Sequence, residues 1–84
     1  MTIKTSDIRP GDVVRFADQR DLVIATSYTA EEKISRIDAI RAFTDGRDEQ
    51  PRAVFFYAGN DSVQDVESRG GLDSVRALFV DLSD

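Results

Sequence analysis

The chain contains no histidine and no cysteine. These two residue types supply the commonest general base, the commonest metal ligand and the strongest nucleophile in proteins. Carboxylates remain, and Asp45, Asp48 and Glu49 lie close enough in sequence to surround a hard cation such as Ca²⁺. Their spacing differs from that of an EF-hand loop, so we interpret them as a solvated acidic turn. We therefore expect a non-enzymatic protein with no catalytic residues, no metal site and no cofactor.

Arginine and aromatic side chains are the other groups with a recognisable role, because they bind nucleic acid when they are interleaved on a barrel surface. The best local group flanks the Asp45-Gly46 pair and consists of Arg41, Phe43, Arg47, Arg52 and Tyr57. The acids beside it cancel much of its positive field, and the net charge of −5 disfavours binding to a polyanion. We expect intramolecular ion pairs here and do not expect nucleic acid to be the partner.

Tyrosine, phenylalanine and arginine also dominate the energetics of protein interfaces, because they offer rigid and amphipathic contacts. On this ground we predict a surface that binds a protein partner, made of Tyr28, Arg41, Arg47, Phe55 and Tyr57. The alternative is that these aromatic residues are simply core, above all Phe55. Alanine substitution separates the two interpretations, because an interface residue affects binding and a core residue affects folding.

Length and composition predict one globular domain over residues 1–84, since the chain has 84 residues and is 40% hydrophobic and 32% charged. No apolar run approaches the roughly 20 residues of a membrane span, and the first residues lack the apolar core of a signal peptide. We expect a cytoplasmic protein that does not contact a membrane. Because the chain cannot form disulfides, its fold is stabilised either by the small hydrophobic core alone or by a core that self-association extends.

Turn residues followed by alternating apolar residues predict strands. Pro10-Gly11 has the chemistry of a type II turn and leads into a strand over residues 12–16. A hairpin loop over residues 17–21 then leads into a second strand over residues 22–28, whose first residues are continuously apolar.

Residues 29–44 admit two interpretations. Thr29 and Glu32 match a capping box, and isoleucines recur every three residues, which is compatible with a helix at about residues 30–43. As a strand, the same segment places Ile37 and Phe43 on one face, and Asp45-Gly46 is a favoured hairpin turn. We favour the strand.

Residues 53–57 predict a strand with Val54 and Phe56 on one face and Phe55 and Tyr57 on the other. Both faces are apolar, so we expect a central strand covered on both sides, or a strand with one face docked on a partner or a second copy. Residues 63–66 predict a short strand or 3₁₀ turn, and residues 72–82 a helical turn followed by a closing strand.

The pattern Ile8-Arg9-Pro10-Gly11-Asp12-Val13-Val14, followed by Thr44-Asp45-Gly46-Arg47 before a hydrophobic strand, resembles small SH3-like barrel proteins. Uncharacterised accessory proteins of actinobacterial phages are among them. The resemblance implies an all-β, SH3-like small barrel of about five strands, with an α+β fold carrying one helix packed on an antiparallel sheet as the alternative.

This fold hosts peptide binding, nucleic-acid binding and structural roles, so it does not select among them. The function that we expect is a protein-interaction module, which the resemblance extends to a phage-encoded accessory or regulatory protein that binds a host or phage protein. A nucleic-acid-binding barrel and a self-assembling structural protein are the rival classes.

Overall fold

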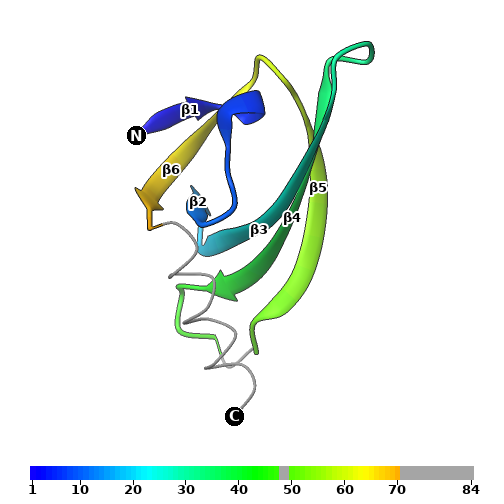
Figure 1. Cartoon of the computed structure of the whole chain (residues 1–84). Helices are drawn as coiled ribbons and strands as arrows, with labels where there is room; N and C mark the ends of the chain where they lie inside the picture. The colour runs from blue at the N-terminus through cyan, green and yellow to red at the C-terminus, as the bar shows by residue number, and fades with distance from the viewer. Residues whose placement is uncertain (48–49, 71–84) are drawn as a thin grey trace.

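A computed structural model describes residues 1–47 and 50–70 of the chain. The described residues form six strands and one 3₁₀ helix, namely β1 (Thr2–Lys4), η1 (Thr5–Asp7), β2 (Asp12–Phe16), β3 (Gln19–Thr29), β4 (Ile34–Phe43), β5 (Arg52–Gly59) and β6 (Val63–Arg69). All neighbouring strands are antiparallel, and they form a single sheet in the order β1-β6-β2-β3-β4-β5 (Figure 1).

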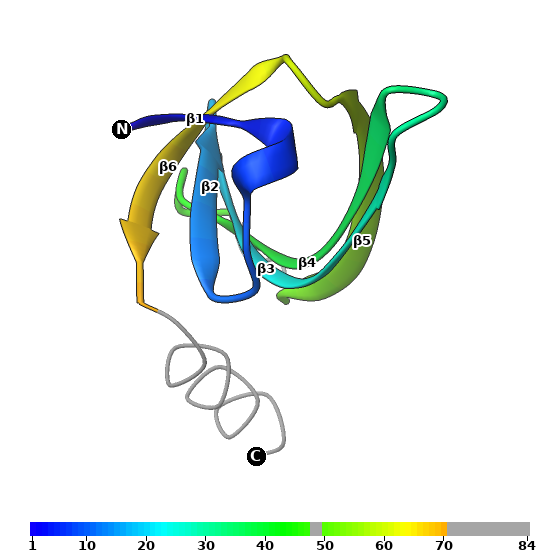
Figure 2. The ribbon, with the colours of Figure 1, turned by 45° about the horizontal axis from the view of Figure 1, so that its top comes forward.

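The sheet curls strongly around its concave face but does not close, because β1 and β5 end it without pairing with each other (Figure 2). The helix η1 ties β1 to the connection between β5 and β6. Thr5 N donates to Ser62 O at 2.8 Å, and Ser6 N donates to Asn60 O at 3.2 Å. The predicted all-β class is confirmed, but the described part of the chain is an open sheet with one strand more than the five expected.

The concave face holds the hydrophobic core. Ile8, Val14, Val23, Ile37 and Val66 are buried there, and Ile3 and Phe56 pack against them. β-branched residues fit this position because their restricted side chains pack well against the pleated surface of a sheet.

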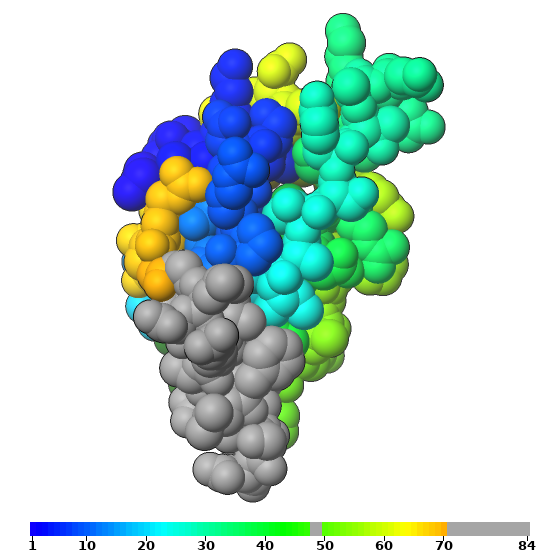
Figure 3. All heavy atoms as spheres, viewed as in Figure 1, coloured from blue at the N-terminus to red at the C-terminus, as the bar shows by residue number. Residues whose placement is uncertain are grey.

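The segment that admitted two interpretations is a strand. β4 pairs with β3 on one side and with β5 on the other, so its backbone groups are satisfied by neighbouring strands. Ile37 and Ala39 are fully buried, as the two-residue alternation predicts. The alternative helix at residues 30–43 is therefore wrong. The turn that joins β3 to β4 protrudes from the body of the molecule, and residues 25–34 are exposed throughout (Figure 3).

The predicted turn at Pro10-Gly11 is confirmed. Gly11 has a φ of 96°, and Asp12 N donates to Arg9 O at 3.1 Å across the two central residues. Two other turns differ from the predictions. Only Ala17 and Asp18 separate β2 from β3, so the loop is shorter than expected. Asp45-Gly46 is no two-residue hairpin turn, because residues 44–51 join β4 to β5.

β5 has the predicted alternation but not the predicted central place. Val54 and Phe56 are half-buried on the concave side, whereas Phe55 and Tyr57 are exposed on the outer side. The strand lies at the end of the sheet and its outer face is exposed, so the expectation of a central strand covered on both faces is wrong. Phe55 is no core residue. Of the two alternatives for residues 63–66, the strand is correct and the 3₁₀ turn is not, and β6 extends further, to Arg69. The prediction for residues 72–82 lies outside the described residues.

Candidate protein-interaction surface

The free edge of β5 is the first feature of the candidate site, and one hydrogen bond fixes its geometry. Asn60 N donates to Lys33 O at 2.9 Å, one position beyond the last paired residues of β4 and β5. In antiparallel strands, hydrogen-bonded and non-hydrogen-bonded pairs alternate. Residues 54, 56 and 58 therefore bond to β4. Ala53, Phe55, Tyr57 and Gly59 direct their backbone N–H and C=O groups away from it.

The turn that follows β5 agrees with this assignment. The carbonyl of Gly59 accepts hydrogen bonds from Ser62 N at 3.0 Å and from Ser62 Oγ at 2.6 Å, so it does not face β4. Along the remainder of the edge, the backbone groups of Ala53, Phe55 and Tyr57 have no hydrogen-bond partner within residues 1–47 and 50–70. These three residues offer an unpaired row of donors and acceptors.

Two exposed aromatic side chains lie beside this edge on the outer face. Phe55 is 58% exposed and Tyr57 is 57% exposed. Their ring centroids are 6.0 Å apart and the rings stand at 85°, which is the edge-to-face arrangement that aromatic pairs prefer. The two rings therefore form one exposed apolar platform.

Arg36 extends the platform from the neighbouring strand. Its Cζ lies 4.4 Å from the centroid of Phe55, and its Nη2 lies 3.1 Å from Asp38 Oδ1. The hydrogen bonds that Arg36 donates to Asp38 raise the pKa of Arg36 above its ordinary value. Sequence reasoning missed this residue. β4 and β5 pair with Arg36 opposite Tyr57 and Asp38 opposite Phe55, and the sequence alone does not give this register.

Tyr28, the third predicted aromatic residue, lies elsewhere. It pairs with Ser35 across β3 and β4, and Ser35 is buried on the concave side together with Ile37. Opposite residues of an antiparallel pair share a face, so Tyr28 points to the face opposite Phe55 and Tyr57. It is 62% exposed and lines a hollow of about 540 Å³ at the end of the sheet where η1 and the turn after β5 meet.

Arg41 forms an ion pair with a buried carboxylate on the neighbouring strand. Its Nε and Nη2 donate to the two carboxylate oxygens of Asp21 at 2.8 and 2.9 Å, and Asp21 is only 3% exposed. In the side-chain amide orientation that satisfies both its oxygen and its nitrogen, Gln19 Oε1 accepts from Nε and Nη2 of Arg41 at 3.0 Å each. The bond to Asp21 raises the pKa of Arg41. This guanidinium therefore neutralises a buried carboxylate.

Arg47 lies in the connection between β4 and β5. It bonds to Asp45 and to Asp18, and its Cζ lies 4.3 Å from the centroid of Phe43. The hydrogen bonds from Arg47 hold the pKa of Asp45 well below its ordinary value of 3.8. The predicted intramolecular ion pairing is confirmed for this pair, whereas Asp48 and Glu49 lie outside the described residues. Of the five predicted residues, the structure thus brings only Phe55 and Tyr57 together.

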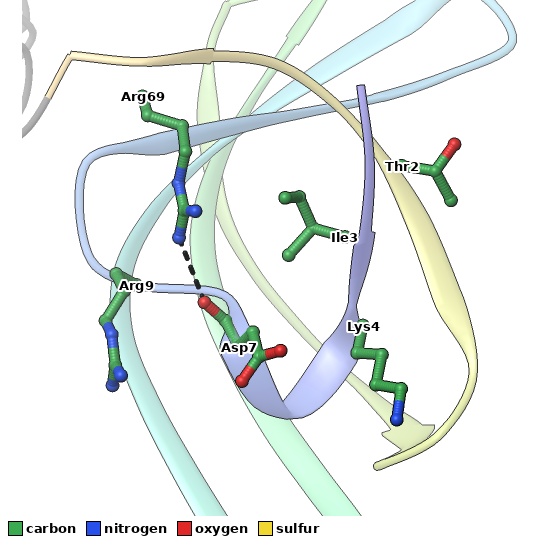
Figure 4. Close-up of a pocket in the computed structure, with 6 residues that line it drawn as sticks. All are labelled: Thr2, Ile3, Lys4, Asp7, Arg9 and Arg69. Atoms are coloured by element: carbon green, nitrogen blue, oxygen red, sulfur yellow. Dashed lines mark hydrogen bonds between the residues drawn. The ribbon is translucent and has the colours of Figure 1, made fainter.

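In each of the two other hollows, an arginine of the lining is paired with a buried carboxylate. A cleft of about 410 Å³ on the concave face contains the Asp21–Arg41 pair between Val14 and Phe56. A second hollow, of about 470 Å³, lies between β1, η1 and the end of β6 (Figure 4). There Arg69 donates to Asp7 O at 3.0 Å and to both oxygens of Asp12 at 3.0 and 3.1 Å. Neither hollow presents a buried polar group without a partner among the described side chains.

Within the described ranges, no three histidine, cysteine or acidic residues lie close enough together to hold a metal ion. No helix in the same ranges is long and apolar enough to cross a bilayer.

Comparison of the chain with protein-family models, with curated proteins and with solved structures finds no match. The assignment of a function therefore depends on the geometry of the surfaces described above.

Proposed function

We propose that this protein is a non-enzymatic protein-interaction module that binds an extended segment of its partner along the free edge of β5. The partner segment adds a strand to the sheet, and its side chains on the outer face contact Phe55 and Tyr57. The observation that carries the proposal is the free edge itself, where the backbone groups of Ala53, Phe55 and Tyr57 are unpaired.

Among the described residues, the part of the edge from Ala53 to Gly59 lacks several of the devices by which sheets prevent such pairing. Monomeric proteins protect an edge with a short strand, a charge, a proline or a bulge. β5 is eight residues long, and from Ala53 to Gly59 it contains neither a charged residue nor a proline. Its register with β4 is unbroken, whereas the β2–β6 and β3–β4 pairs both contain a shift. An edge of this kind is suited to accept another strand.

The geometry also describes the partner segment. Main-chain hydrogen bonds supply affinity in strand addition, and alternate side chains supply specificity. Alternate residues of the added strand lie beside Phe55 and Tyr57, so apolar or aromatic residues at alternate positions fit this platform. Arg36 carries a charge beside the rings, but Asp38 already neutralises it. We therefore expect an uncharged partner strand.

The charges support a protein partner over nucleic acid. Arginines in the described part of the chain pair with carboxylates at five places, Arg20 with Glu67, Arg36 with Asp38, Arg41 with Asp21, Arg47 with Asp45 and Arg69 with Asp12. A guanidinium already held by a carboxylate contributes little to binding of a phosphate backbone. We retain an SH3-like architecture as a prediction, which the strong curvature of the sheet supports.

Site-specific photo-crosslinking tests the proposal. Purified protein that carries a photoreactive phenylalanine analogue at position 57 or at position 28 is irradiated in a lysate of the source organism, and crosslinked proteins are identified by mass spectrometry. Tyr28 is a matched control, because it is a tyrosine of similar exposure on the opposite face. We expect a defined protein adduct from position 57 and none from position 28. Equal adducts from both positions, or none from position 57, would contradict the proposal.

A further inference from the structure

We infer that the strand that β5 accepts is β5 of a second copy of this chain, paired antiparallel about a twofold axis at Phe55. This inference rests on the proposed function, since it names the partner of the same edge. A symmetric interface needs a surface that is complementary to itself. The sequence of β5 meets this condition in one register.

Backbone groups select the register. With Phe55 opposite Phe55 of the second copy, Ala53 lies opposite the second Tyr57, and every unpaired N–H and C=O of these three residues gains a partner. Antiparallel pairing then gives about six hydrogen bonds between the copies. A shift by two residues in one direction places Tyr57 opposite Pro51, which has no N–H. A shift in the other direction brings in Gly59, whose carbonyl already accepts from Ser62.

Side-chain sizes agree with the same register. On the outer face, the large ring of Tyr57 lies opposite the methyl group of Ala53 in the second copy, so the two do not compete for space. The two Phe55 rings meet at the axis, where opposite residues of a hydrogen-bonded pair have Cα atoms about 5.5 Å apart. Each Phe55 already stands edge-to-face with its own Tyr57. Pairing therefore joins two aromatic platforms into one cluster.

Charge does not oppose this pairing. Arg52 is the only charged residue of β5. In the proposed register it lies opposite Ala58 of the second copy, and the two Arg52 residues are six positions apart along the paired strands. This separation is about 20 Å at the rise of a β-strand, which exceeds the Debye length of about 8 Å at physiological ionic strength.

The experiment combines a measurement of mass with disulfide trapping, which is straightforward because the chain has no cysteine. Sedimentation equilibrium of the unmodified protein is measured over a concentration series. Phe55→Cys, Ala53→Cys and Tyr57→Cys are then oxidised separately. Position 55 faces itself at a distance that a disulfide spans. Positions 53 and 57 each lie about 14 Å from their own copy, four strand positions away, so neither forms a disulfide with itself.

We expect a concentration-dependent dimer and a disulfide-linked dimer from Phe55→Cys alone. Equal trapping at all three positions would indicate unspecific association and overturn the inference, as would a monomer at every concentration. If the protein is monomeric and position 57 still crosslinks to a different protein, the inference fails and the proposed function stands. If neither a second copy nor another protein contacts position 57, both fail.

Discussion

The two strands that end the sheet, β1 and β5, differ in length and in how firmly the surrounding residues hold them. β1 has three residues and carries Lys4, which lies 3.9 Å from Asp61. Met1, the residue before β1, is held to β6 through both of its backbone polar groups. Its amino group lies 3.3 Å from Asp65 Oδ1, and its carbonyl accepts from Val66 N at 2.7 Å. β5 has eight residues, and its free edge from Ala53 to Tyr57 is uncharged.

The differences in length and in anchoring affect how readily each edge can pair with a further strand. The end at β1 is short and is tied to the body by the hydrogen bonds of η1, so a further strand gains few backbone contacts there. The end at β5 offers a long and regular edge beside an aromatic platform. The proposed addition of a strand therefore concerns the β5 edge and not the β1 edge.

The largest effect that we predict concerns the two sides of β5. Val54→Pro removes an N–H that faces the fully buried Ala39 on β4, and it also removes packing on the concave side. Leaving a buried carbonyl unpaired and losing apolar burial costs about 3 kcal/mol together. Ala53→Pro removes an N–H that faces the free edge, so it costs less than about 1 kcal/mol. Urea unfolding measures both free energies, and equal losses would show that the assigned alternation is wrong.

The second prediction concerns the opposite end of the sheet. The hydroxyl of buried Thr5 lies 2.8 Å from Ser62 Oγ, donates to Ser62 O at 3.0 Å and accepts from Gln64 Nε2 at 3.2 Å. Thr5→Val keeps the shape but leaves these groups without their partner, which costs about 1–2 kcal/mol. In a domain of this size, each kcal/mol lowers the melting temperature by about 4–8 °C. An unchanged melting temperature would mean that this network does not hold the β1 end, and exposed Thr2→Val is the control.

The third prediction compares the two edges directly. Ala53→Lys places a charge on the β5 edge, and Thr2→Lys places the same charge on exposed β1. Both sites are exposed, so unfolding free energies change by less than about 0.5 kcal/mol. We expect Ala53→Lys to weaken self-association at least tenfold, or about 1.4 kcal/mol, and Thr2→Lys to leave it unchanged. Sedimentation equilibrium measures both, and equal weakening would remove the distinction between the edges.

Local patterns were sufficient to predict part of this fold. The strand at residues 12–16 follows from the Pro10-Gly11 turn, and the two faces of residues 53–57 follow from a period of two. The place of β5 at the end of the sheet was not predictable in this way. It depends on strand order, and β6 pairs with β2 across a separation of about fifty residues that no local pattern records.

The same limit applies to the candidate site. Phe55 and Tyr57 were placed together because they are two positions apart on one strand. The ion pair of Arg41 with buried Asp21 was not predicted, because the register of β3 and β4 brings these two residues opposite each other. Arg36 was not predicted either, because the register of β4 and β5 is what brings it opposite Tyr57. Residues that act within one strand were visible in the sequence, whereas residues that meet across strands were not.

The smallest effect concerns the connection that leads into β5. Arg47 holds the pKa of Asp45 below 3.8, so the folded state binds its proton less readily than the unfolded chain does. Such a group stabilises the fold above about pH 4, and its contribution is lost as the pH falls through the lowered value. Asp45→Asn is therefore slightly less stable than the unmodified protein at pH 7, and the difference fades in acid. The pair is exposed, so the effect is small.

An NMR titration checks the cause directly, because Arg47→Ala returns the carboxyl group of Asp45 to its ordinary pKa. If that pKa does not rise, the ion pair does not fix the segment before β5, and the orientation of the open edge depends on the β4–β5 pairing alone.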